Sequence, residues 1–317
     1  MNEPADFDDP RLFERAERDG DAAERTGYSD YSYWKSTVRV FLRNRIAFVA
    51  LVVVSVLLLF TFIQPFLPGE RDPNLIHINP ETGRQLRNAR PGAEYRLGTN
   101  SIGQDLWARI WTGTRTSMLI GITVASIRVF LGILVGSLWG YIRKTDRMMT
   151  EIYNVLANIP TTIVMALFAY ILRPSMQTMI IAMTVLGWLP ISRFIRNQVV
   201  IIRDREYNLA SRCLGTPTRR VIVRNILPYL VSVIMLQFAL AIPLVIAGEV
   251  FLSYIGLGLP LNIPSLGNLV NEGRQLMMIP SLRYQLIYPS VILSLITISF
   301  YVMGNAFADA ADPRTHV

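Results

Sequence analysis

A basic segment at residues 203–228, RDREYNLASRCLGTPTRRVIVRNILP, has the residue types and spacing to bind another protein. It lies between two long apolar runs, and its first twelve residues contain no Gly or Pro and favour a helix. Gly215 can end that helix in the left-handed conformation, Thr216 offers a hydroxyl cap, and Pro217 suits the start of a second helix. The segment therefore predicts a short pair of helices that a second protein could grip.

Two ionisable side chains, Arg128 and Glu249, interrupt apolar runs elsewhere in the sequence. Ionisable groups in lipid are costly and usually face the interior of the protein. One hypothesis is that one or both face a polar path through the membrane or pair with each other. The alternative is structural: Glu249 is a hydrogen-bond anchor for an outer gate, and Arg128 belongs to a buried structural pair.

Several other classes of site lack the residues they need. Cys213 is the single cysteine, so a disulfide framework and a Cys-based metal site are excluded. The two histidines, His77 and His316, form no HExxH motif, and the sequence has no GxxxxGK[ST] loop for ATP. No acid/base constellation is present. We therefore predict that the chain is not an enzyme and binds no metal, cofactor or nucleic acid, its net charge of +8 coming from basic loops.

The bulk of the sequence is apolar and predicts an all-α integral membrane protein. Hydrophobic residues make up 51% of the 317 residues, and the mean hydropathy is +0.35. Several apolar runs reach the roughly 18 residues that a spanning helix needs, and they are continuous rather than alternating. We expect six spans, with a kink at Pro160 and a break near Pro243. The predicted spans are residues 46–66, 117–142, 152–172, 176–195, 229–252 and 286–307.

Charge predicts the orientation of these spans. Eight Arg and two acidic residues lie between positions 193 and 224, which is the strongest positive-inside signal in the chain. The same rule places both termini in the cytoplasm. The acidic N-terminal tail favours disorder, with a short amphipathic helix around residues 10–25 as the alternative. The predicted regions are this cytoplasmic tail at 1–33, an interfacial elbow helix at 34–45, the first span and an external loop at 46–116, a core at 117–307 and a cytoplasmic tail at 308–317.

The basic segment resembles the cytoplasmic loop of ABC importer permeases known as the EAA loop. Ala210 stands at the matching Ala position, but Leu209 replaces the Glu and Ser211 replaces the second Ala. Gly215 and the Leu-Pro pair at 227–228 also match the pattern. The Arg-Glu-Tyr sequence that leads into the loop looks like the peptide-transporter branch of the family.

Other motifs in the expected order extend the resemblance from residue 34 to residue 314. LGTNSIGQD at 97–105 is similar to the LGTDxxGRD of C-type permeases from dipeptide, oligopeptide and nickel importers, with Asn100 in place of Asp and Gln104 in place of Arg. Residues 248–268 resemble the stretch ExxLSFLGLG…PSWGN, with Leu266 in place of Trp. The remaining matches are Trp188, Arg193 and Arg196 after the fourth span and Asp309, Asp312, Pro313 and Arg314 near the C-terminus.

The resemblance implies the type I ABC importer permease fold in a bacterial or archaeal plasma membrane. It implies four kinds of partner: membrane lipid, a homologous second permease, two ATPase subunits that use ATP and Mg, and an extracytoplasmic substrate-binding protein. Di- and oligopeptides are the cargo that it favours, with nickel or other metal chelates, or other small solutes, as the alternative. This chain would supply half of the translocation pathway and take its energy from the ATPase.

The resemblance also assigns roles to residues. The set implied to couple to the ATPase is Glu206, Leu209, Ala210, Ser211, Leu214 and Gly215. Because Leu209 is apolar, we predict a packing contact there and no ionic one; the alternative is an ordinary solvated loop. Arg128 and Glu249 are candidates for the path or its gate. Asp105, Gly256 and Gly258 are candidates for the external rim, although Asp105, with Trp107 and Trp111, could instead be an interfacial anchor.

Two competing classes make different predictions. A self-sufficient secondary transporter or channel would show inverted repeats and paired broken helices. Pro160 and Pro243 fit that idea, but the long loop after the first span and the basic segment before the fifth make the halves unlike. A membrane-embedded enzyme would need a catalytic constellation, which the sequence does not offer.

Overall fold

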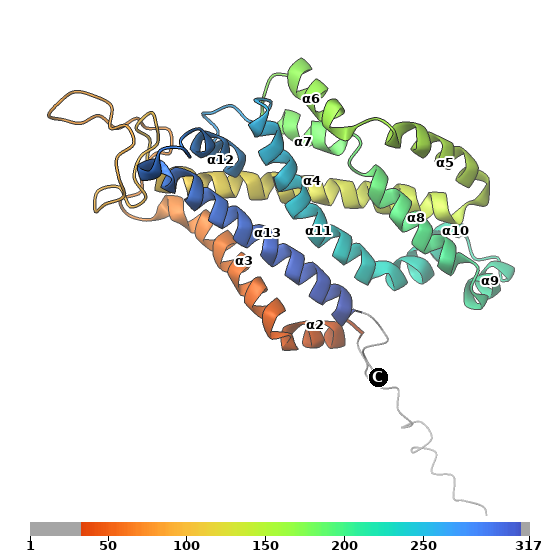
Figure 1. Ribbon diagram of the computed structural model, residues 1–317. Helices are drawn as coiled ribbons and strands as arrows, with labels where there is room; N and C mark the ends of the chain where they lie inside the picture. Colours follow the sequence, from red (N-terminus) through yellow and green to blue (C-terminus); the bar gives the residue numbers. More distant parts are fainter. Residues whose placement is uncertain (1–32, 312–317) are drawn as a thin grey trace, which may run out of the picture.

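The computed structural model describes residues 33–311. The predicted N-terminal tail at 1–33 lies outside that range except for its last residue, as does most of the predicted tail at 308–317. The described elements are helices, with isolated β-bridges in the long loop before residue 106, and the long helices lie side by side (Figure 1). The longer elements are α2 (Tyr33–Arg43), α3 (Arg45–Ile63), α4 (Leu106–Tyr141), α5 (Arg143–Ala157), α6 (Thr161–Ile171), α7 (Met176–Thr184), α8 (Leu189–Arg203), α9 (Glu206–Cys213), α11 (Leu227–Tyr254), α12 (Leu266–Gln275) and α13 (Tyr284–Ala310).

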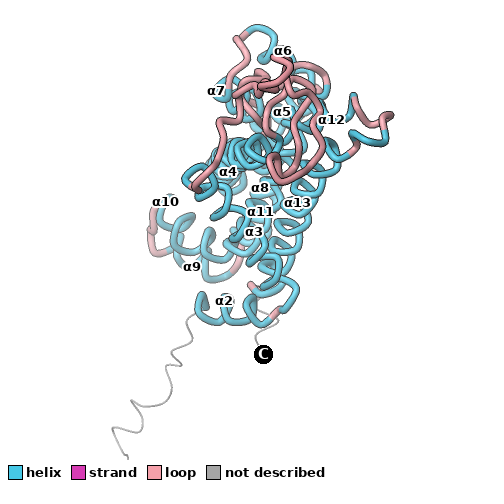
Figure 2. Tube along the Cα trace, turned by 90° about the vertical axis from the view of Figure 1, so that its left-hand side faces the viewer, coloured by secondary structure: helices cyan, strands magenta, loops and turns pink. Residues whose placement is uncertain are grey.

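The helices confirm the predicted all-α membrane fold. Five are long and apolar enough to cross a membrane, and α5 with α6 makes a sixth if that pair is counted as one span. The pair is bent by 70° at Pro160, where the predicted kink lies, because a proline ring obstructs the preceding helical turn. The loops before α4 face the viewer in Figure 2 and lie at one end of the bundle.

α4 is the central helix, and it corrects one sequence interpretation. The sequence predicts that the second span begins at residue 117, but the helix begins at Leu106, so Trp107 and Trp111 belong to the same helix of 36 residues. α8 lies closely against the second half of α4, where glycines recur every four residues at 132, 136 and 140. A Cβ at Gly140 would lie 2.8 Å from the carbonyl oxygen of Arg196. Small residues at this spacing let two helix backbones approach each other in a membrane.

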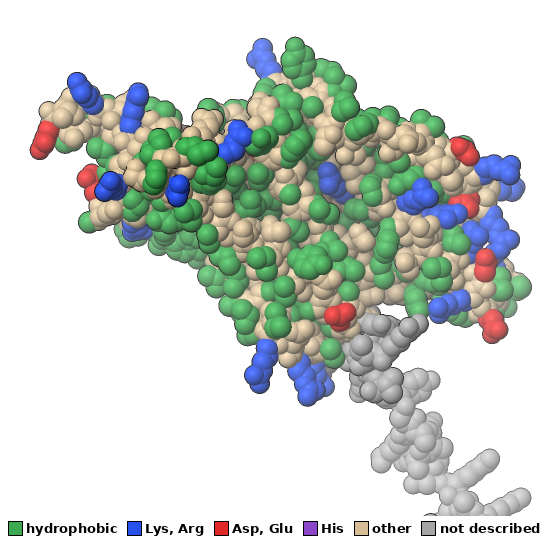
Figure 3. Space-filling model, viewed as in Figure 1, with side chains coloured by type: hydrophobic (Ala, Val, Ile, Leu, Met, Phe, Trp, Pro, Cys, Tyr) green, Lys and Arg blue, Asp and Glu red, His purple; other side chains and the backbone are tan. Residues whose placement is uncertain are grey.

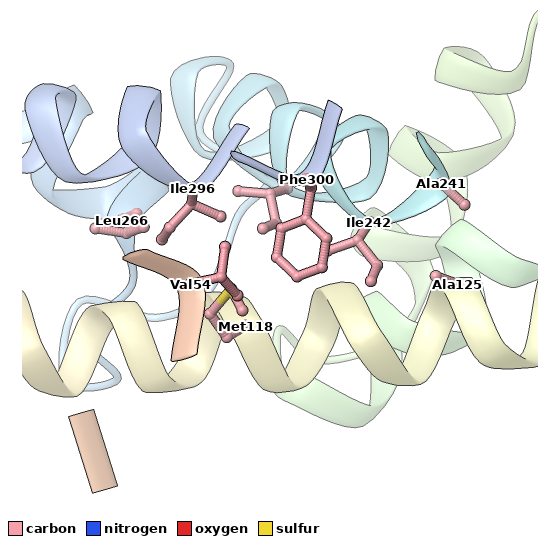
Figure 4. Close-up of a cluster of buried hydrophobic side chains, with 9 residues drawn as sticks. Val54, Met118, Ala125, Ala241, Ile242, Leu266, Ile296 and Phe300 are labelled. Atoms are coloured by element: carbon pink, nitrogen blue, oxygen red, sulfur yellow. The ribbon is translucent and has the colours of Figure 1, made fainter. Parts of the chain in front are cut away.

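α11 also differs from the expectation, because it runs through Pro243 without a break. Ala241 and Ile242, next to the proline, belong to a buried cluster to which α3, α4, α12 and α13 also contribute (Figure 4). Packing against α4 and α13 along its length holds α11 in one piece. A short α10 (Thr218–Val221) and a π-helical turn (Ile222–Ile226) lead into α11 from the basic segment.

Charged side chains lie mainly at the two ends of the molecule, and its flanks are mainly apolar (Figure 3). Lys and Arg side chains gather over the end formed by α5, α9 and α10, while hydrophobic side chains cover much of the flank formed by α3 and α13 (Figure 3). The chain changes direction between α2 and α3 at Asn44, which caps the start of α3. The Oδ1 of Asn44 accepts hydrogen bonds from the backbone N–H groups of Ile46 at 3.1 Å and Ala47 at 3.2 Å. The α9 end is therefore the one that the positive-inside rule assigns to the cytoplasm.

Candidate functional site

The basic segment folds into a short helix, α9, and a left-handed turn. Gly215 has φ +75°, its N–H donates to the carbonyl of Arg212 at 3.0 Å, and the N–H of Thr216 donates to that of Ser211 at 3.1 Å. These two bonds end the helix in the way that a C-terminal glycine allows. The first helix begins at residue 206 rather than 203, because α8 extends to Arg203 and the chain turns after it. The second begins after Pro217 without the predicted side-chain cap from Thr216.

Asp204 forms ion pairs with three arginines at this turn. Its carboxylate lies 3.1 Å from Arg143, 3.3 Å from Arg203 and 3.9 Å from Arg212. Burial raises the pKa of the Asp204 carboxyl, but hydrogen bonds from Arg203 and Arg143 outweigh that effect and bring the pKa below its ordinary value. Ion pairs to α5, α8 and α9 thus hold this turn in place.

A pair of Asn residues, one of them buried, ties α9 to the membrane helices and was not predicted from the sequence. Asn208 is fully buried, and its Nδ2 donates to the carbonyl oxygen of Ile202 at 3.0 Å. Asn225, in the π-helical turn before α11, donates to Asn208 Oδ1 at 3.2 Å and to Ser211 Oγ at 3.3 Å. No local pattern marks these two residues, which lie 17 positions apart. Through them α9 is bonded both to the end of α8 and to the start of α11.

The predicted coupling residues lie together on and just after α9, and most are exposed. Leu214 is 86% exposed and Leu209 is 43% exposed, beside an exposed Tyr207. Glu206, Ala210 and Gly215 are also exposed, and Ser211 is half-buried. A cluster of exposed apolar side chains on a surface loop is typical of a protein-binding surface rather than a solvated loop.

Glu249 is fully buried and accepts four hydrogen bonds. Its Oε1 accepts from the hydroxyls of Ser253 at 3.2 Å and Ser265 at 2.7 Å, and its Oε2 from the hydroxyl of Ser117 at 3.0 Å and the N–H of Gly267 at 3.3 Å. The carboxylate thereby joins α11 to α4 and to the first turn of α12, a helix that the sequence did not predict. A carboxylate is also favoured at a helix N-terminus by the helix dipole.

Arg128 does not pair with Glu249, which corrects that part of the sequence hypothesis. Its Nε donates to the carbonyl oxygen of Met183 at 2.9 Å, and its Nη2 donates to the same oxygen. The side chain lines a cavity of about 240 Å³ between α4, α6, α7, α8 and α11. Of the two membrane charges, Arg128 therefore faces open space and Glu249 does not.

The external candidates have mainly local structural roles. Asp105 is buried, and its Oδ1 caps α4 by accepting from the N–H groups of Trp107 at 2.8 Å and Ala108 at 3.3 Å. Gly256 has φ +80°, which few other residues tolerate. At Gly258 a Cβ would lie 2.5 Å from the Cα of Ser253. These glycines shape the turn after α11, and Gly256 is exposed there.

An ion pair behind this rim, with a buried arginine, was also not predicted from the sequence. Arg109, 1% exposed, lies 2.9 Å from Glu272 on α12 and donates to Gln104 Oε1 at 2.5 Å. Asn100 Nδ2 donates to the same Gln104 oxygen at 3.0 Å. The two positions at which 97–105 departs from the LGTDxxGRD pattern are therefore in direct contact. A neutral pair stands here where the pattern has an acid and a base.

This contact gives a testable prediction for Gln104→Arg. A second guanidinium beside buried Arg109 is expected to destabilise the protein by about 2 kcal/mol, because like charges repel strongly where water is excluded. Adding Asn100→Asp is expected to restore most of the loss by supplying a counter-charge. Thermal unfolding of the single and double variants measures the coupling. If the double variant is no more stable than Gln104→Arg alone, the two positions are not coupled.

The family follows from comparison with known proteins. The profile of the binding-protein-dependent transport system inner membrane component matches residues 129–317, and that of the N-terminal TM domain of oligopeptide transport permease C matches residues 32–87. The chain belongs to the binding-protein-dependent permease family. This confirms the resemblance that the sequence motifs indicated. As a member of that family it is a multi-pass membrane protein.

Relatives of this permease match it over nearly its whole length. The oligopeptide transport system permease protein AmiD of Streptococcus pneumoniae is 37% identical, over 97% of this chain and 98% of the relative. The oligopeptide transport system permease protein OppC of Bacillus subtilis is 30% identical, over 96% of this chain and 97% of the relative. The dipeptide transport system permease protein DppC of B. subtilis is 32% identical over 96% and 92%. Among residues 33–311 no group of three or more His, Cys, Asp or Glu could hold a metal ion in this permease.

Proposed function

We propose that this chain is one of two permease subunits in an ATP-driven importer of di- and oligopeptides. Relatives named as oligopeptide and dipeptide permeases, matched from end to end, support the cargo. The observation that carries the mechanism is the exposed apolar surface of α9, bonded through Asn208 to α8 and α11. The proposed partners are a homologous permease, two cytoplasmic ATPase subunits that bind ATP and Mg, and an extracytoplasmic binding protein. The membrane is the plasma membrane.

The proposed coupling is a helix docked in a groove of the ATPase. Leu209, Leu214 and Tyr207 would pack into that groove, and the apolar Leu209 replaces any ionic contact at its position. When the two ATPase subunits close on ATP, the docked α9 would move and carry α8 and α11 with it. The permease bodies would then alternate between inward-open and outward-open states. Glu249 would hold the outer end rigid during this movement.

Gly215→Pro tests the coupling role. Proline cannot adopt φ +75° and lacks the N–H that bonds Arg212, so the end of α9 is expected to unfold locally. In proteoliposomes with all partner subunits, we expect peptide uptake and peptide-stimulated ATP hydrolysis to fall at least about tenfold. Gly69→Pro is the matched control, since Gly69 also has positive φ, in the loop at the other end. Survival of both activities in Gly215→Pro would disprove the coupling role.

The same preparation tests the proposed function against its alternatives. We expect the chain to purify with a second permease and two ATPase chains and to take up labelled trialanine in an ATP-dependent manner. Uptake of nickel chelates instead of trialanine would replace the cargo but keep the mechanism. Transport by this chain alone, driven by an ion gradient, would identify a secondary transporter.

A further inference from the structure

Arg128 is a cation inside the bundle without a carboxylate partner among residues 33–311. The ion pairs of that part of the chain involve other arginines. Within the described part of the chain, the carbonyl oxygen of Met183, at the end of α7, is the one acceptor of its hydrogen bonds. A guanidinium has five N–H donors, so most of its donating capacity is not used by these bonds. Arg128 lies about 20 Å along α4 from its predicted cytoplasmic end, well within the membrane.

Small residues make room for the side chain of Arg128 beside the cavity. A Cβ at Gly187 would overlap the Nε and Cζ atoms of Arg128, so only glycine at this position leaves the side chain where it lies. Gly248 of α11 borders the same cavity. Thr161, the first residue of α6, also lines it and is exposed. The positive end of the α6 dipole thus adds to the charge of Arg128.

The rest of the cavity wall is apolar and adaptable. It includes Val164, Met165, Leu186 and Leu244. Such a wall tolerates side chains of many shapes, and methionine adapts well to varied neighbours. A peptide importer meets variable side chains on a ligand whose C-terminal carboxylate does not vary. One fixed cation in an adaptable wall matches that chemistry.

We propose that this cavity binds a carboxylate in transit, the C-terminal carboxylate of the transported peptide, with Arg128 as its partner. The identity of the ligand as a peptide rests on the proposed function; the anion site does not. The Met183 carbonyl keeps part of the guanidinium occupied, which keeps the binding weak enough for release. Transport sites need binding that permits entry and also exit.

Thiol labelling tests the anion site without transport. In the assembled complex carrying Cys213→Ser, Thr161→Cys places a single thiol of this chain in the cavity, and free 2-mercaptoethanol serves as the reference thiol. We expect an anionic methanethiosulfonate (sulfonatoethyl) to react at residue 161 about tenfold faster than a cationic one (trimethylammonioethyl), relative to the same ratio for the free thiol. Arg128→Gln is expected to abolish this preference. An unchanged preference in Arg128→Gln overturns the site.

Protection and uptake identify the source of the carboxylate. Excess trialanine is expected to slow labelling at residue 161, whereas trialanine amide is not. In uptake, Arg128→Gln should lower transport of trialanine about tenfold and that of its amide less than twofold, each relative to wild type.

Gly187→Ala, which keeps Arg128 but displaces its guanidinium, should give the same pattern. Protection by neither peptide, or equal losses for both, overturns the proposal. Failure of the wild type to carry trialanine would refute the proposed peptide cargo, while the labelling still decides the anion site.

Discussion

Glu249→Leu is expected to destabilise the protein by about 3 kcal/mol, because it removes the acceptor of four buried hydrogen bonds. The N–H of Gly267 cannot turn to another acceptor, and the hydroxyls of Ser117 and Ser265 lose a partner that they share across three helices. The midpoint of thermal unfolding, followed by fluorescence size-exclusion chromatography, should fall by about 5 °C or more. Glu249→Gln should lose less, since its amide keeps one acceptor oxygen.

Glu151→Leu is the matched control for this prediction. Glu151 is exposed on α5 and undergoes the same chemical change, so its effect should stay within about 0.5 kcal/mol. If Glu249→Leu unfolds at the wild-type temperature but loses transport, Glu249 acts in the pathway and is not the anchor that its bonds describe. That outcome would support the hypothesis from the sequence that Glu249 lines the translocation path or its gate.

Asn208→Leu is expected to uncouple ATP hydrolysis from transport. The substitution removes the bond to the Ile202 carbonyl and the acceptor for Asn225, so α9 can dock on the ATPase without moving α8 and α11 together. We expect peptide uptake per ATP hydrolysed to fall about tenfold, with the four subunits still assembled. The ratio of uptake to hydrolysis is the measurement, since a merely unstable protein loses both in proportion.

The control for this uncoupling is Asn197→Leu. Asn197 is exposed on α8 and receives a bond only from the neighbouring Arg196 among the described side chains. Its uptake per ATP should match that of wild type. An unchanged ratio in Asn208→Leu would show that α9 moves the membrane helices through its backbone connections alone.

The features that the sequence determined are those with local physical causes. Long apolar runs must be helical in lipid, so the spans could be located from composition. Pro160 bends its span and Gly215 ends α9, because each restricts or permits particular backbone angles whatever surrounds it. The spacing of motifs was enough to indicate the family.

The tertiary structure decided what depends on contacts between distant residues. Pro243, like Pro160, lies within an apolar run, and the sequence predicts a break at both. Side chains packed around Ala241 and Ile242 nevertheless keep the helix that contains Pro243 continuous. Arg128 and Glu249 both appear as charges in apolar runs, and only packing assigns four donors to one and a cavity to the other.

The basic segment shows the same division. Its charged composition predicts a surface loop, and its motif predicts that it binds another protein. The bonds of Asn208 to Ile202 and to Asn225, which is 17 positions away, connect that loop to the end of α8 and to the turn that leads into α11. A hydrogen bond depends on distance and angle in space, which residue types and local spacing do not specify when the partners lie on different elements.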